Sequence, residues 1–100
     1  LPECFYCAYL SPSNEILAID NISKGGITGT VADPKTILVR ALLLNATQLI
    51  IAHNHPSGNR KASSADERVT RQIRDAANLL DMTLLDSIII TDHSHSNIPF

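Results

Sequence analysis

Two histidines stand one residue apart after an apolar run in the stretch IIAHNHPSGNRKASSAD, residues 50–66. If that run is a strand, side chains two residues apart point to the same side, so His53 and His55 aim both imidazoles at one point while Asn54 faces away. A lone histidine in such a place is more often a buried structural residue, whereas two convergent imidazoles are the usual beginning of a transition-metal site. The stretch therefore predicts a metal site, and the turn sequence at 56–58 predicts an open strand end.

Asp66 is the candidate for a third ligand. It precedes Val69 by three residues in a segment with a helical pattern, so it is expected on the helix face that packs toward the sheet, pointing back at the histidines. Two His and one Asp leave a fourth tetrahedral position for water, as in catalytic zinc sites. The alternative is a helix cap, because Ser-x-x-acid is a capping pattern. We assign that cap to Ser64 and Glu67, which leaves Ser63 and Asp66 for chemistry.

The pattern His53-x-His55, seven residues, then Ser63-x-x-Asp66 resembles the JAMM motif of the JAB/MPN+ zinc metalloproteins. The stretches HNHPSG, SSAD, SKGGITGTVADP and LLDSIIIT are similar to the RadC-like family, which was named for DNA repair. This resemblance implies one zinc ion per chain, held by His53, His55 and Asp66. It also implies a hydrolase acting on a peptide amide or isopeptide bond, with Ser63 hydrogen-bonded to the metal's water or to the developing oxyanion.

The family pattern also contains an upstream glutamate that acts as general acid and base on the metal's water. Glu3, in LPECFYCAYL, stands at that position, and Glu15 is the nearby alternative. A glutamate so near the start of a chain is otherwise simply solvated. The sequence departs from the family at Pro34-Lys35-Thr36, where Pro-Arg-Glu is common, and at Asp86-Ser87, where Asp-His is common. Neither place holds a ligand of the motif, so these departures concern substrate or surface preference.

Association with DNA is the alternative from another functional class, either as a nuclease or as a binding module for DNA or a protein partner. Five of the eight basic residues fall between Arg60 and Arg74, although the net charge is −2. Phosphate neutralisation supplies most non-specific affinity for DNA, so this charge predicts only weak binding by the domain alone. A third alternative is a domain with an intact motif that only serves as a scaffold for a partner.

Two further patterns are expected to be structural. Cys4 and Cys7 form a C-x-x-C without a second pair, which predicts reduced core cysteines and no structural zinc site. His93 and His95 form a second H-x-H in the tail DHSHSN. With no third ligand at a fixed spacing, they predict a solvated loop.

The strands that would position these residues are visible as apolar runs. CFYCAYLS and EILAIDNI, separated by the turn sequence at 12–14, predict an antiparallel hairpin at one edge of a sheet. TQLIIA predicts a strand buried on both faces, and TLLDSIIIT predicts a last central strand. The glycine-rich KGGITGT predicts a loop or bulge, because it lacks the spacing of a dinucleotide- or phosphate-binding loop.

Two helices are expected between the strands. The first starts at the cap Asp33 with Pro34 and runs for about three turns, and the second spans roughly 64–80. The residues expected to face inward are Ile37, Leu38, Ala41, Leu42 and Leu44 or Asn45 in the first helix, and Val69, Ile73, Ala76 or Ala77 and Leu80 in the second. The polar face of the second helix is expected to hold Arg68, Arg71, Asp75 and Asn78.

This order of elements predicts a single α/β domain over residues 1–100, with a mixed β-sheet flanked by helices. The resemblance narrows the fold to the cytidine-deaminase-like JAB/MPN type. A composition of 44% hydrophobic and 18% charged residues is typical of a soluble globular protein. There is neither a membrane-length apolar run nor a signal-peptide pattern, so we expect a cytoplasmic protein without membrane partners. Because the sequence begins at Leu1 with a strand-like segment, we expect it to be the C-terminal part of a longer protein.

Overall fold

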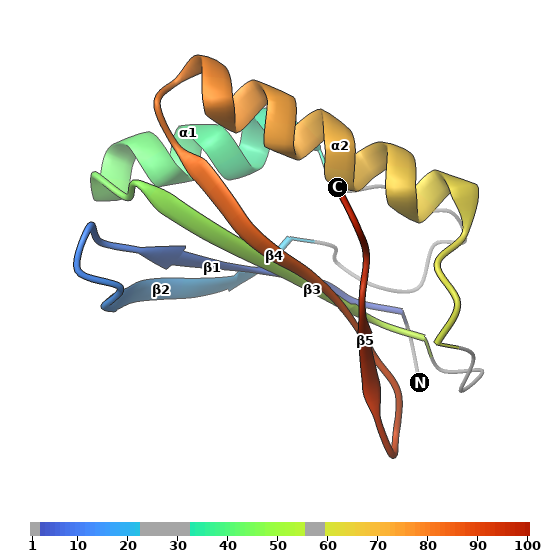
Figure 1. Cartoon of the computed structure of the whole chain (residues 1–100). Coiled ribbons are helices and arrows are strands. Elements are labelled where there is room, and N and C mark those ends of the chain that lie inside the picture. The colour runs from blue at the N-terminus through green and yellow to red at the C-terminus, as the bar shows by residue number, and fades with distance from the viewer. Residues whose placement is uncertain (1–2, 23–32, 56–59) are drawn as a thin grey trace.

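A computed structural model describes residues 3–22, 33–55 and 60–100 (Figure 1). The strands and helices, in chain order, are β1 (Phe5–Leu10), β2 (Ile16–Asn21), α1 (Pro34–Leu44), β3 (Gln48–Asn54), α2 (Ser64–Leu79), β4 (Thr83–Ile90) and β5 (His95–Asn97). The five strands form one sheet in the order β2-β1-β3-β4-β5. Only β3 and β4 pair in parallel, and the other neighbouring pairs are antiparallel. The predicted single α/β domain with a mixed sheet is confirmed.

The predicted hairpin at the sheet edge is also confirmed. β1 and β2 pair antiparallel, and a tight turn joins them in which the Ser11 amide donates to the Glu15 carbonyl at 2.9 Å. Asn14 has a positive φ of 67° in this turn, a conformation that asparagine tolerates better than most residues. The predicted turn at 56–58 and the predicted loop KGGITGT lie outside the described residues.

Both helices cover the same face of the sheet (Figure 1). Side chains alternate along β3, so Leu49, Ile51 and His53 point toward the helices and are buried. The helices contribute the buried residues Ile37, Leu38 and Ala41 from α1 and Val69, Ile73 and Ala77 from α2. The core therefore lies between α1, α2 and one face of the sheet.

Two leucines that were expected to face inward do not. Leu42 is 52% exposed, because at 100° per residue it lies about a quarter turn away from the buried face of α1. Leu80 is 44% exposed, because the helical conformation ends there and the chain turns back. Met82, two residues further on, is buried at 4% exposure.

The tail that was expected to be a solvated loop contains a short strand, so that prediction is wrong for the backbone. β5 pairs antiparallel with β4, although His93 and His95 are exposed as expected. Polar side chains hold β5 in place: Asn97 Nδ2 donates to both oxygens of Asp86 at 2.8 and 2.9 Å, and Ser96 Oγ donates to the Arg60 carbonyl at 2.7 Å. Pairing with β5 makes β4 an internal strand, as predicted.

Neither α1 nor α2 has the length and the apolar composition that a helix needs to cross a membrane.

The chain reverses after each helix at a residue with positive φ, which is Asn45 after α1 and Asp81 after α2. Asn45 is the left-handed cap of α1, and its amide donates to the carbonyls of Ala41 and Leu42. Such caps end a helix by satisfying its last carbonyls.

The two cysteines have different surroundings, and neither is in a disulfide. Cys7 is fully buried in the core, as predicted, and burial raises the pKa of its thiol to about 12. Cys4 precedes β1 and is only partly buried, so it is not a core residue.

We predict that iodoacetamide at pH 8 leaves Cys7 of the native protein unmodified, because the reagent reacts with exposed thiolates. Cys4 should be modified first, and Cys7 only after denaturation in guanidinium chloride. Peptide mass spectrometry of the modified protein measures both sites. If Cys7 were modified as fast in the native protein as in the denatured one, its burial would be contradicted.

Candidate metal centre

The two histidines converge as the sequence predicted. His53 lies in β3 and His55 follows the end of that strand, and their Nε2 atoms are 3.0 Å apart. The imidazole rings are tilted by 56° to each other, with centroids 4.8 Å apart. Two ring nitrogens therefore point at the same small volume.

Asp66 faces both histidines from the first turn of α2. Its Oδ1 lies 3.2 Å from Nε2 of His53, and its Oδ2 lies 3.3 Å from Nε2 of His55. Partial burial raises the pKa of Asp66, but hydrogen bonds from Ser63 and the two nearby histidines outweigh burial and hold this pKa below its usual value. The carboxylate is therefore negatively charged at neutral pH.

His53 is held in an apolar setting. Its ring stacks on that of Phe5, with centroids 5.7 Å apart and planes 2° from parallel, and only 5% of the residue is exposed. Phe5 of β1 and Ile89 of β4 are its cross-strand partners. Burial lowers the pKa of His53, and the nearby Asp66 carboxylate opposes only part of this effect. The imidazole is therefore neutral at pH 7, which is the form that ligates metals.

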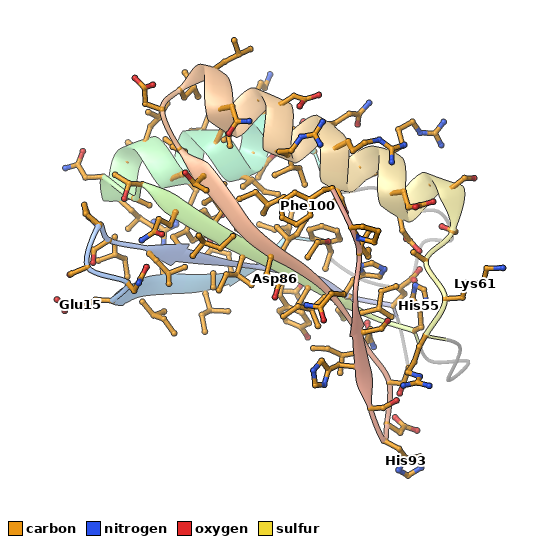
Figure 2. The ribbon with its side chains drawn as sticks, viewed as in Figure 1. Glu15, His55, Lys61, Asp86, His93 and Phe100 are labelled. Carbon is orange, nitrogen blue, oxygen red and sulfur yellow. The ribbon has the colours of Figure 1, made fainter. Side chains whose placement is uncertain are left out.

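Glu3 lies next to His55, with its Oε1 3.7 Å from His55 Nε2. It comes just before β1, whose antiparallel pairing with β3 sets Phe5 opposite His53 and brings the start of β1 to the end of β3. Its side chain is 55% exposed. Glu15, the alternative, lies in the β1–β2 turn at the opposite end of the sheet, as Figure 2 shows.

The helix cap was assigned one residue too late. Ser63 is the N-cap of α2, with the extended φ and ψ of −78° and 165°, and its Oγ accepts the Asp66 amide at 3.0 Å. Asp66 Oδ2 in turn accepts the Ser63 amide at 2.8 Å, which completes a capping box. Ser64 is already helical, so the predicted pair of Ser64 and Glu67 is wrong. Asp66 thus caps the helix and faces the histidines at once, and the direct catalytic role of Ser63 stays a prediction.

The second histidine pair and the basic residues of α2 do not join His53, His55 and Asp66. His93 lies at the tip of the β4–β5 hairpin, away from His55 (Figure 2). Arg68 and Arg71 are exposed on α2, and Arg74 contacts its neighbour Asp75, with Nη2 2.8 Å from Oδ1. Phe5 is the residue at the site that sequence reasoning missed. Phe5 could have been predicted from its position two residues after Glu3, because side chains two residues apart in a strand lie on the same face.

We predict that Ser63→Ala lowers the free energy of unfolding by about 1 kcal/mol, because it removes the side-chain cap of α2. Ser64→Ala is the matched control, and it should change this free energy by less than about 0.5 kcal/mol, as for most exposed positions. Urea denaturation followed by circular dichroism measures both variants. A larger loss in Ser64→Ala than in Ser63→Ala would restore the cap first assigned from the sequence.

Comparison with known proteins matches residues 2–98 to a family described as the RadC-like JAB domain. The chain is 41% identical over 90 residues to a UPF0758 protein of Flavobacterium johnsoniae, covering 90% of this chain and 39% of that relative. UPF0758 proteins of Thioalkalivibrio sulfidiphilus and Nitrosococcus oceani are 40% and 41% identical over 90 residues, again covering 90% of this chain and 40% of each relative. The chain thus spans about two fifths of the length of these relatives. It belongs to the RadC-like JAB domain family.

Proposed function

We propose that this domain is a zinc-dependent hydrolase of the JAMM type that cleaves a peptide or isopeptide bond. In this proposal His53, His55 and Asp66 hold one zinc ion and Glu3 is the general acid and base. One observation supports it above the others: the Nε2 atoms of the two histidines lie 3.0 Å apart, and the Asp66 carboxylate places Oδ1 3.2 Å from His53 Nε2 and Oδ2 3.3 Å from His55 Nε2.

These separations suit a metal ion. Ligand atoms bound to one tetrahedral zinc at about 2.0–2.1 Å lie about 3.3 Å from each other. A neutral imidazole has a hydrogen on one ring nitrogen and a lone pair on the other, so with both hydrogens on Nδ1 the two Nε2 lone pairs, 3.0 Å apart, are placed to bind one cation. The lowered pKa of His53 favours this neutral form, and the lowered pKa of Asp66 favours the anion. The donor set therefore has the charge and chemistry of a divalent metal site.

In the proposed hydrolysis, the metal and the chain's own residues have separate roles. Zinc in such a site acts as a Lewis acid and lowers the pKa of water toward 7. The Glu3 carboxylate would accept a proton from the attacking water and return it to the leaving nitrogen, which suits an exposed group whose Oε1 lies 3.7 Å from His55 Nε2. The stacked ring of Phe5 supports the ring of His53, and the hydrogen bonds with Ser63 orient the carboxylate of Asp66.

The exposed position of Glu3 favours a substrate that approaches from solvent at the strand ends. A peptide or an isopeptide-linked side chain is thin enough to reach such a place. The charge on α2 does not favour DNA binding, because the exposed Arg68 and Arg71 share this helix with the acidic Glu67 and Asp75. The experiment below nevertheless includes a DNA substrate, because the basic residues of this helix face solvent.

We predict about one zinc per chain in the purified domain, since the three ligands form one site. A His53→Ala, His55→Ala double variant should lose it, whereas a His93→Ala, His95→Ala double variant should keep it. Inductively coupled plasma mass spectrometry gives the metal content of each. Stoichiometric zinc in the His53→Ala, His55→Ala protein would mean that the ligands lie elsewhere.

We predict that Glu3→Gln keeps its zinc and loses hydrolysis by about 10²- to 10⁴-fold, because the amide cannot accept the proton. Asp66→Asn should instead weaken zinc binding, since a neutral group replaces an anionic ligand. A peptide library, isopeptide-linked peptides and branched DNA are tested with one preparation, and Glu15→Gln, at the far end of the sheet, is the matched control.

Cleavage of DNA alone would favour the nuclease alternative. Full activity in Glu3→Gln would mean that another group is the base. If Glu3→Gln lost its zinc while Asp66→Asn kept it, the two carboxylates would have exchanged roles.

A further inference from the structure

We infer that Asn54, the residue between the two histidines, is a positioning residue that holds Glu3 beside His55. The inference rests on the proposed function, in which Glu3 transfers the proton. It assigns to Asn54 no contact with substrate or metal. Its basis is a set of hydrogen bonds between the end of β3 and the residue that follows Glu3.

Asn54 binds the backbone of Cys4 at two points. The Asn54 amide donates to the Cys4 carbonyl at 3.3 Å, and the Cys4 amide donates to Oδ1 of the Asn54 side chain at 2.5 Å. Both main-chain polar groups of Cys4 are thus bound by one residue. Cys4 is the direct neighbour of Glu3, so these two bonds fix the backbone one residue away from the proposed base.

The side-chain bond occurs where β1 and β3 part. The ladder between these strands ends at Phe5 and His53, while β3 stays paired with β4 as far as Asn54 and Ile90. The His55 amide then donates to the Ile90 carbonyl at 2.9 Å, so the chain continues along β4 and not along β1. In a regular antiparallel ladder a main-chain carbonyl would accept the Cys4 amide. Here the side chain of Asn54 accepts it, beside the main-chain bond from the Asn54 amide to the Cys4 carbonyl.

Glu3 depends on this connection because its side chain is 55% exposed. Within residues 3–22, 33–55 and 60–100, its carboxylate approaches His55, with Oε1 3.7 Å from Nε2. An exposed glutamate keeps most of its rotamer freedom, so its mean position follows its backbone. Small displacements of a catalytic group reduce the rate steeply. Anchoring Cys4 therefore keeps the Glu3 carboxylate within reach of the site.

The test uses Asn54→Ala, which removes the acceptor, and Asn54→Asp, which keeps an acceptor oxygen in the same place. Asn97→Ala is the matched control, because it removes hydrogen bonds between β4 and β5 of the same sheet. Four quantities are measured on each protein: zinc content, the exchange rate of the Cys4 amide, the nuclear Overhauser effect between Glu3 and His55, and hydrolysis of the substrate found for the wild type.

Asn54→Ala should keep its zinc, speed exchange of the Cys4 amide about fivefold and weaken the Glu3–His55 signal. Hydrolysis should fall about 10-fold or more through kcat, and Asn54→Asp should recover much of it. In the Glu3→Gln background Asn54→Ala should cause no further loss, because a residue that acts through Glu3 is not additive with it.

Unchanged exchange and an unchanged Glu3–His55 signal in Asn54→Ala would overturn the inference. So would an additive loss in the double variant, or an equal loss of hydrolysis in Asn97→Ala. If the wild type cleaved none of the substrates, the proposed function would fail, and the exchange and Overhauser measurements would still decide whether Asn54 positions Glu3.

Discussion

The parallel pairing of β3 with β4 is the constraint on which the rest of the molecule depends. Two parallel neighbours need a connection that returns to the starting edge, and here α2 is that crossover. The helix must therefore begin near the carboxyl end of β3, where His53 and His55 lie. The first turn of α2 carries Asp66 to this edge, and the antiparallel pairing of β1 with β3 brings Glu3 to it from the other side.

The capping box links helix stability to the geometry of the site. Ser63 and Asp66 satisfy each other's amides, so the hydrogen bonds that begin α2 also orient the carboxylate that faces the histidines. These bonds help to keep Asp66 ionised, while the apolar contacts of His53 keep that imidazole neutral. A neutral imidazole and an ionised carboxylate thus lie 3.2 Å apart, and the surroundings of each group set its protonation state.

Sequence alone predicted the features that depend on local periodicity. Side-chain alternation was enough to bring His53 and His55 together, and helical spacing placed Asp66 on the face that meets them. The cap was misassigned because two adjacent serines precede two adjacent acids, so Ser63 with Asp66 and Ser64 with Glu67 satisfy the same pattern. The extended backbone of Ser63 and its reciprocal hydrogen bonds with Asp66 distinguish the two pairs in the structure.

The features that sequence missed depend on contacts between distant segments. The residues of β5, His-Ser-Asn, have little intrinsic strand preference, and their pairing is supported by Asp86 and by the buried Ile98. Neither contact has a signature in the tail itself. The hydrogen bonds between Asn54 and Cys4 join residues 50 positions apart, and the sequence near either residue does not predict them.

Charge balance connects the proposed centre with the stability of the domain. Asp66 and Glu3 bring two carboxylates to the pair of histidines, and both lie within 3.7 Å of the same nitrogen of His55. Such a cluster destabilises a fold when nothing compensates its negative charge, and partial burial of Asp66 strengthens the repulsion. A divalent cation would cancel the charge of both groups. Because it would bind the folded chain far better than the unfolded one, its binding energy would also stabilise the junction of β1, β3 and α2.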